Sequence, residues 1–237
     1  MKVLNTVIAL FLLNLFVMPV SSAEEAIVNV AKVANNSNTT LTDGEFDQRG
    51  YFTVRPDFRK CLFPLCGGYF VKAVNRTLTP CPDGSLKAEC YIASLNNREK
   101  LNLSSAVLLQ GVIRAKNYGE FGNLGIFLVK AAFSAATQAI GDGTFVGLEN
   151  NGIVCITTPC FSVDQYLLNK NKIRMISGID LQGVGTTDVV LNTALSIMAN
   201  DGVLIASGSN QQVEEMAGKG LTFVANQLYL PIKDSVK

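Results

Sequence analysis

The chain has 237 residues, of which 48% are hydrophobic and 16% charged, a balance typical of a folded protein of one or two domains. Histidine is absent, which excludes catalytic triads with an imidazole base and histidine-ligated metal sites. The formal net charge is +1, without the basic excess that binding to a polyanion needs, so no nucleic-acid partner is expected.

The first 23 residues have the organisation of a secretory signal peptide. Lys2 precedes an apolar stretch over residues 3–20, and small residues lead to a cleavage site after Ala23. An uncleaved membrane anchor is the alternative, but the stretch is at the short end for a bilayer span and two asparagines interrupt it. We therefore expect export, to the periplasm or the extracellular space, with no integral membrane segment after cleavage. Residues 24–46 are expected to form a flexible leader.

An internal repeat divides the rest of the chain. The pattern C-x(4)-C, followed after eight residues by Asn, begins at Cys61 and again at Cys155, 94 residues further on, and its asparagines are Asn75 and Asn169. Looser matches around these positions drift by only a few residues, as expected when insertions fall in loops. The sequence therefore predicts two related units, residues 47–140 and 141–237.

Six cysteines in an exported chain predict disulfides. The second unit has only two cysteines, so they pair with each other or stay free if the unit folds alone. The same local ring in the first unit leaves its other two cysteines as the third pair. A four-cysteine zinc site in the first unit is the alternative, but its spacing is not that of a zinc ribbon, and we expect no metal and no cofactor. The predicted disulfides are Cys61–Cys66, Cys81–Cys90 and Cys155–Cys160.

Segments rich in β-branched and aromatic residues, separated by Asn, Gly, Asp and Pro clusters, predict a mainly β fold with a few short helices, α+β remaining possible. Apolar spacing predicts one helix over residues 187–198, and a second short helix is considered over residues 211–217. Strand-rich units must close or cover their sheet edges. We favour two related β-barrel-like or sandwich lobes, and one composite sheet built from both units is the alternative. The predicted strands are residues 51–55, 68–74, 90–95, 107–116, 125–133, 144–148, 163–168, 173–179, 203–206 and 221–230.

Two stretches carry a family resemblance. YFTVRPDFRKCLFPLCGGYFVKAVN over residues 51–75, with CPDGSLKAECYIASLN over residues 81–96, resembles the signature RPDxRxCxxPxCGGYFVxxVN of secreted bacterial proteins that carry a domain of unknown function, many from myxobacteria and their relatives. GIVCITTPCFSVDQYLLN over residues 152–169 is similar to the companion segment of these proteins. The resemblance implies export and a cysteine-stabilised fold over most of residues 47–237, and it implies no activity.

The first disulfide ring is the leading candidate for recognition. It would hold Leu62, Phe63 and Leu65 in a rigid apolar loop, which is the kind of preorganised element that docks into a partner's pocket, as a protease inhibitor does. The alternative is that the ring fixes a bend and these side chains face the core. Since the second ring carries different side chains at the equivalent place, the scaffold interpretation is favoured.

Two charged sets are weaker candidates. Asp57, between Arg55 and Arg59, is able to clamp a carboxylate or a sugar, although a Pro-Asp turn with compensating charge is commoner. Paired carboxylates would suffice for a hydrolase without histidine, but turn and helix-cap roles are favoured for the acidic residues considered. Those residues are Asp142, Glu149, Asp180, Asp188 and Asp201.

The sequence therefore predicts an exported, disulfide-stapled, non-enzymatic binding or structural module with an unidentified protein or glycan partner. An inhibitor-like ligand acting through residues 61–66 is the alternative, and a carboxylate-based hydrolase is the third interpretation.

Overall fold

Strands dominate the part of the chain that the computed structural model describes, which is residues 50–200 and 202–233. The predicted signal peptide and leader lie outside these residues. Side chains in the strands alternate between the covered and the open face of the sheet. In β1, for example, Phe52 is buried and its two neighbours are only half-buried. The strands are β1 Gly50–Pro56, β2 Tyr69–Ala73, β3 Thr79–Pro80, β4 Leu86–Lys87, β5 Cys90–Ile92, β6 Ser94–Asn96, β7 Ala106–Arg114, β8 Ile126–Ala135, β9 Thr144–Asn150, β10 Val163–Leu167, β11 Ile173–Ile176, β12 Gly178–Asp180, β13 Leu204–Glu215 and β14 Gly218–Pro231.

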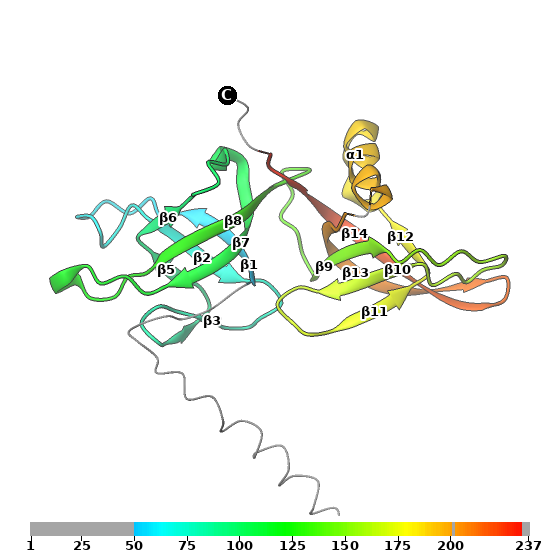
Figure 1. The fold of residues 1–237 in the computed structure, drawn as a ribbon, viewed down its shortest axis with the longest axis horizontal. Helices are drawn as coiled ribbons and strands as arrows, with labels where there is room; N and C mark the ends of the chain where they lie inside the picture. The colour runs from blue at the N-terminus through cyan, green and yellow to red at the C-terminus, as the bar shows by residue number, and fades with distance from the viewer. Residues whose placement is uncertain (1–49, 201, 234–237) are drawn as a thin grey trace, which may run out of the picture. The chain divides into compact units, whose positions relative to one another are not determined.

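Twelve of these strands form one sheet, in the order β11-β10-β9-β13-β14-β8-β7-β1-β2-β5 (Figure 1). Neighbours along this path are antiparallel, whereas β12 joins β14 and β6 joins β8 in parallel. We call residues 50–140 the first half and residues 141–233 the second half. The halves meet where β14 pairs with β8, with Tyr229 opposite Ala135. The small hairpin β3–β4 stands apart from the sheet.

The prediction of two barrel-like lobes is wrong. The sheet is open, with β11 and β5 at its two ends. The composite sheet that was the alternative describes the strand pairing. Its physical basis is the length of β14, a strand of 14 residues. One end of β14 pairs with β13 and the other reaches β8, so a single strand supplies hydrogen-bonding edges to both halves.

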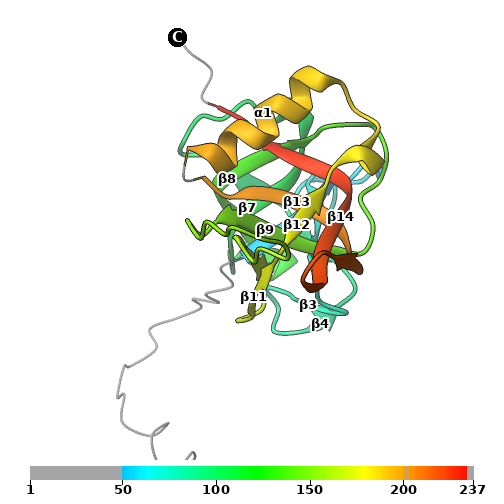
Figure 2. The same cartoon turned by 90° about the vertical axis from the view of Figure 1, so that its right-hand side faces the viewer.

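The helix predicted over residues 187–198 is confirmed as α1, Asp188–Ala199, with Thr187 at its N-cap position. It packs Ala194 and Met198 into the core of the second half, where it lies against the strands (Figure 2). The helix considered over residues 211–217 is wrong. Those residues belong to the hairpin of β13 and β14, in which Gln211 pairs with Thr222 and Glu215 with Gly218.

Three turns of 3-10 helix also connect the strands: η1 Leu103–Ser105, η2 Gly119–Phe121 and η3 Gln182–Val184. In residues 50–200 and 202–233, no helix has the length and apolar character that a bilayer span requires.

Three clusters of buried side chains form the core. One lies in the first half around Phe127, another in the second half around Phe223, and a third at the junction around Leu108 and Tyr229. Because the junction cluster takes residues from both halves, buried apolar contacts join the halves there.

The side chain of Asn75 ties the first half to the second. Its amide donates hydrogen bonds to the carbonyl oxygens of Phe145 and Leu168, at 2.7 and 2.8 Å, and its oxygen accepts the N–H of Phe145 at 2.9 Å. All hydrogen-bonding atoms of the amide head except one lone pair are therefore engaged with main chain about 70 to 93 residues away in sequence.

Asn169 makes the reciprocal contact. Its amide donates to the carbonyl oxygens of Tyr51 and Val74, at 2.7 and 3.0 Å, and its oxygen accepts the N–H of Tyr51 at 2.8 Å. Both asparagines have left-handed backbones, with φ of 56° at Asn75 and 60° at Asn169, a conformation that asparagine adopts more readily than other residues with a side chain. The two contacts are equivalent, each joining an asparagine of one half to backbone of the other.

Candidate functional site

The structure pairs the six cysteines as predicted, in three local rings: Cys61–Cys66, Cys81–Cys90 and Cys155–Cys160. The middle pair is buried in the core of the first half, whereas the other two close loops at the surface. Three disulfides are typical of a protein that folds in an oxidising compartment, as exported proteins do.

The loop over residues 61–66, which we call the first ring, presents apolar side chains to solvent. Leu62 is 71% exposed, Phe63 61% and Leu65 43%, while Pro64 and Cys66 between and after them are buried. The favoured scaffold interpretation is therefore wrong in expecting these three side chains to face the core. The ring of Phe63 contacts that of Tyr118, edge to face at 6.1 Å between centroids.

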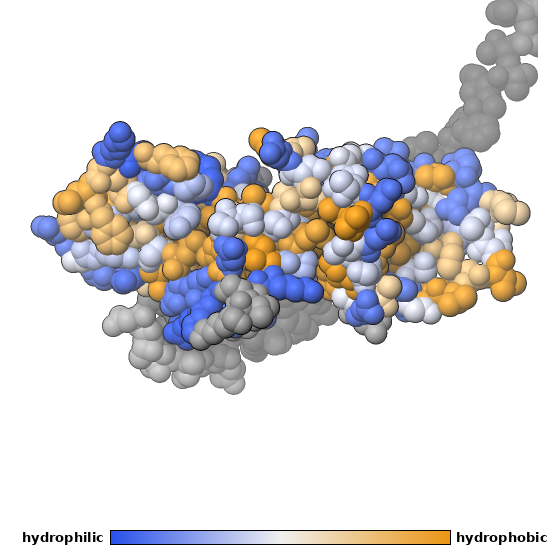
Figure 3. Space-filling view, turned by 90° about the horizontal axis from the view of Figure 1, so that it is seen from above, coloured by the Kyte–Doolittle hydropathy of each residue, from blue (hydrophilic) through white to orange (hydrophobic). Residues whose placement is uncertain are grey.

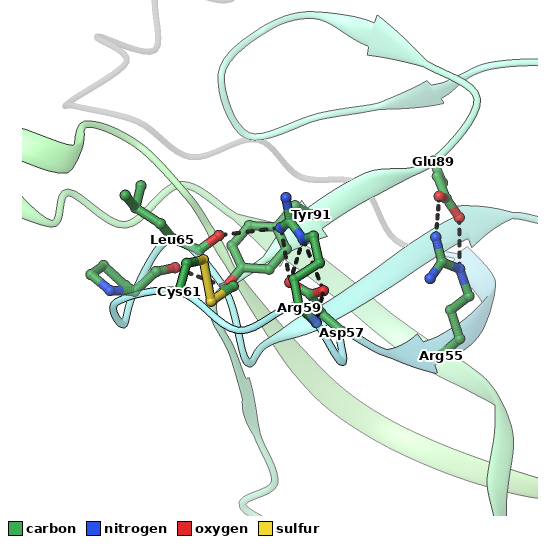
Figure 4. Close-up of polar contacts among 9 residues, drawn as sticks. Arg55, Asp57, Arg59, Cys61, Leu65, Glu89 and Tyr91 are labelled. Atoms are coloured by element: carbon green, nitrogen blue, oxygen red, sulfur yellow. Dashed lines mark hydrogen bonds and ion pairs between the residues drawn. A yellow bond between two sulfur atoms is a disulfide. The ribbon is translucent and has the colours of Figure 1, made fainter.

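A buried carboxylate fixes the start of the first ring. The side chain of Asp57 is 1% exposed and takes three hydrogen bonds of 2.8 to 3.0 Å from the guanidinium of Arg59 (Figure 4). The same guanidinium donates to the carbonyl oxygen of Leu65 at 3.2 Å. A paired charge of this kind is satisfied internally, so Asp57 and Arg59 brace the loop instead of offering free groups to a ligand.

An aromatic platform supports the other side of the loop. The hydroxyl of Tyr91 in β5 donates to the carbonyl oxygen of Pro64 at 2.7 Å. The guanidinium of Arg59 lies 5.4 Å from the ring centre of Tyr91 and 5.2 Å from that of Phe70, within the range of cation–π attraction. Backbone of the first ring is thus held by a disulfide, an ion pair and a tyrosine.

Arg55 does not join Asp57 in a common clamp. It pairs through two hydrogen bonds with Glu89 (Figure 4), and its guanidinium lies 4.2 Å from the ring centre of Phe70. Glu89 and Tyr91 were not predicted from the sequence as members of this site. The pairing of β2 with β5 brings Glu89 and Tyr91 beside Arg55 and Arg59, and no local sequence pattern predicts that pairing.

Acid should destabilise two loops. One is the start of the first ring, where Asp57 is buried, and the other is the turn between β3 and β4, where Asp83 bonds to Ser85 and Lys87. The Arg59 guanidinium holds the pKa of Asp57 below its ordinary value, and hydrogen bonds from Ser85 and Lys87 lower the pKa of Asp83 to about 2. Since both pKa values are lower in the folded than in the unfolded chain, their stabilisation is complete above the ordinary carboxyl pKa and is lost as the pH falls through the folded values.

We therefore expect the free energy of unfolding to be level near neutral pH and to fall between about pH 4 and pH 2. Urea unfolding measured across that range checks this, with carboxyl carbon NMR titrations to assign the steps. In the variants Asp57→Asn and Asp83→Asn the acid limb should flatten. An acid limb with the same slope in both variants would contradict the assignment.

The loop over residues 155–160, the second ring, forms another apolar tip. Ile156 and Val154 are fully or almost fully exposed, and the carbonyl oxygen of Thr158 accepts the N–H of Ala217 at 2.9 Å. That bond brings the exposed Met216 of the β13–β14 turn close to the ring. The two rings lie toward opposite ends of the described sheet (Figure 1), and Figure 3 shows strongly hydrophobic atoms at the surface of the second of these ends.

Most of the acidic residues considered for a hydrolase have local partners. The carboxylate of Asp142 accepts the N–H of Gly143, that of Asp180 accepts the N–H of Gln182, and that of Glu149 accepts the hydroxyl of Tyr166. Asp188 is the first residue of α1, and Asp201 lies outside the described residues. Within the described ranges, no group of three potential ligands could hold a metal ion.

Fold and site together define a disulfide-stabilised, mainly β module that presents cysteine-closed apolar loops. Residues 50–235 match the family described as a domain of unknown function, DUF6748, and the chain belongs to this family. Neither the curated proteins nor the solved structures contain a match to the chain. This match confirms the predicted resemblance to proteins that carry a domain of unknown function. The signature motif and the bacterial source stay predictions.

Proposed function

We propose that this protein is an exported, non-enzymatic binding module that docks onto a protein partner through the first ring. The observation that carries the proposal is the exposure of Leu62, Phe63 and Leu65 on a backbone that is held in place from several sides. Burying three such side chains supplies the apolar centre of a small interface.

Rigidity matters for the expected affinity. A free hexapeptide would lose backbone and side-chain freedom on binding, at a cost of about 1–2 kcal/mol per residue for the backbone. In this chain the disulfide and the bonds from Arg59 and Tyr91 restrict the loop before any partner arrives. That preorganisation is the physical property that an inhibitor-like loop requires.

A protein partner is favoured over a glycan. Sugar binding needs several free hydrogen-bonding groups around an aromatic ring, whereas the exposed side chains within the first ring are apolar and the nearby Asp57 and Arg59 are bonded to each other. An apolar loop without free polar groups instead matches a hydrophobic pocket on a protein surface.

We also propose that residues 47–140 and 141–237 arose by duplication, with residues 1–23 directing export. The equivalent bonds of Asn75 and Asn169, which are 94 residues apart like the paired cysteines, support duplication. The surface disulfides support export.

The test replaces Leu62, Phe63 and Leu65 together with serine. Because these side chains are exposed, the thermal midpoint should stay close to that of the unmodified chain. Capture of the partner from the native secretome, by cross-linking to the exported chain, should fall at least tenfold, as expected when an apolar hot spot is removed.

The matched control combines Val154→Ser, directly before the second ring, with Ile156→Ser inside it, and so removes exposed apolar surface at the other end. Capture should survive in this control. Equal capture by both variants would show that the first ring is not the docking element, and unfolding of the triple variant would show that it belongs to the scaffold.

A further inference from the structure

A cavity of about 560 Å³ lies beside β1 and β2. Its other wall is the linker that joins the two halves, residues 136–143 between β8 and β9. Its volume falls within the range of small-molecule sites, about 300–1,000 Å³. It is separate from both rings and shares with the first ring's surroundings only the Arg55–Glu89 pair and Phe70. The lining residues that decide what it can bind are Arg55, Lys72, Glu89, Val107, Phe145 and Tyr229.

The body of the cavity is apolar. Phe145 and Tyr229 stack with ring centres 5.5 Å apart, and Val107 contributes aliphatic surface from β7. Ile140 is 95% exposed at the linker side. An apolar surface of this extent is stabilised when a ligand displaces its water.

The linker wall is fixed by a buried amide. Gln227 has no exposed surface, and its Nε2 donates to the carbonyl oxygen of Ala139 at 2.6 Å and to the carbonyl and hydroxyl oxygens of Thr137 at 3.2 and 3.0 Å. The Gln227 oxygen accepts the N–H of Thr137. The cavity is therefore a formed feature with a held wall, which reduces the ordering that a ligand must impose.

The mouth carries one cation without an acidic partner. Arg55 and Glu89 neutralise each other, whereas Lys72 makes no ion pair with any described residue. Asp142 borders the adjoining cavity, together with Lys72 and Arg76, and does not line this one. The net charge of the lining is therefore positive, which complements an anion.

From these observations, we propose that the cavity binds a small amphipathic carboxylate, with its aliphatic or aromatic body against Val107, Phe145 and Tyr229 and its carboxylate at Lys72. This ligand site is independent of the docking loop. A failure of one would leave the other intact.

Dodecanoate, below its micelle concentration, is the probe, and titration calorimetry of the exported chain is the measurement. We expect saturable binding, with NMR shifts at the amides of Val107 and Ala135 and none at residues 62–65. Dodecyltrimethylammonium, which has the same tail and the opposite charge, should bind more weakly. Absence of saturable binding, or equal affinity for both amphiphiles, would overturn the proposal.

Two variants locate the site. Val107→Phe fills the cavity from an exposed strand position and should weaken dodecanoate binding at least tenfold. Lys72→Gln should weaken it about fivefold, the loss expected for one partly exposed charge pair, and should remove the preference over the cationic amphiphile.

Lys130→Gln is the matched control, because Lys130 is an exposed strand lysine that does not line the cavity. Its affinity for dodecanoate should be unchanged. An equal loss in Lys72→Gln and Lys130→Gln, or unchanged affinity in Val107→Phe, would place binding elsewhere and refute the site.

Discussion

Replacing Asn169 with alanine is expected to lower the free energy of unfolding by about 3 kcal/mol. The substitution removes three hydrogen bonds that join the halves, and it leaves the N–H and carbonyl groups of Tyr51 and the carbonyl group of Val74 without that partner. Alanine at φ near 60° adds a backbone cost that asparagine largely avoids. Urea unfolding followed by circular dichroism measures the loss.

Two companion variants separate these causes. Asn169→Asp keeps an oxygen for the Tyr51 N–H but cannot donate, so it should recover only part of the loss. Asn102→Ala is the control, because Asn102 caps a surface turn through bonds to Ser104 alone, and it should cost about 1 kcal/mol or less.

The equivalent substitution Asn75→Ala should cost a similar amount, since Asn75 makes the same three bonds in reverse. The double variant should cost less than the sum of the two, because the first substitution already weakens the junction that the second acts on. Losses below 1 kcal/mol for both single variants would show that the apolar junction, and not the asparagine pair, holds the halves together.

Replacing Gln227 with leucine is expected to destabilise the chain by about 2–3 kcal/mol. The change has little effect on side-chain volume, but it deprives the carbonyl oxygens of Thr137 and Ala139 and two backbone N–H groups of their partner. Since those groups hold the linker, the linker wall of the cavity should also loosen. Denaturant unfolding gives the stability, and amide exchange at residues 137–139 reports the loosening.

Gln165→Leu provides a matched comparison, because Gln165 is also buried but bonds to the side chain of Asn210 instead of to backbone. The partly exposed Asn210 can turn to water, so this loss should be clearly smaller. Equal losses in the two glutamine variants would mean that burial of the amide, and not its hold on the linker, sets the cost.

The local features of the fold were predictable. The strands alternate buried and exposed side chains over short segments, and α1 has apolar residues at helical spacing after Thr187. The cysteine pairs are close in sequence, so their rings follow from spacing. The failure at residues 211–217 has the opposite cause. Its Gln and Glu residues favour a helix locally, but pairing with β14 over the whole hairpin satisfies far more backbone groups.

The candidate site was predictable only in outline. The sequence identified the first ring and its neighbours Asp57 and Arg59, but periodicity does not state whether a loop side chain turns inward or outward. Exposure of Phe63 depends on which groups anchor the backbone, and one of them, Tyr91, is remote in sequence. The matching positions of Asn75 and Asn169 were visible as a repeat, while their hydrogen bonds across the junction were not.

By itself, the sequence determined a mainly β chain with neighbouring cysteine pairs and one helix, because each of these depends on residues a few positions apart. The tertiary structure alone decided that the strands form one open sheet, that Arg55 pairs with Glu89, and that Gln227 fixes the wall of a cavity. The two side-chain contacts join residues 34 and 88 positions apart, and at the sheet junction Tyr229 lies opposite Ala135, 94 positions away. The energies of such contacts depend on strand register and burial and leave no periodic trace in the chain.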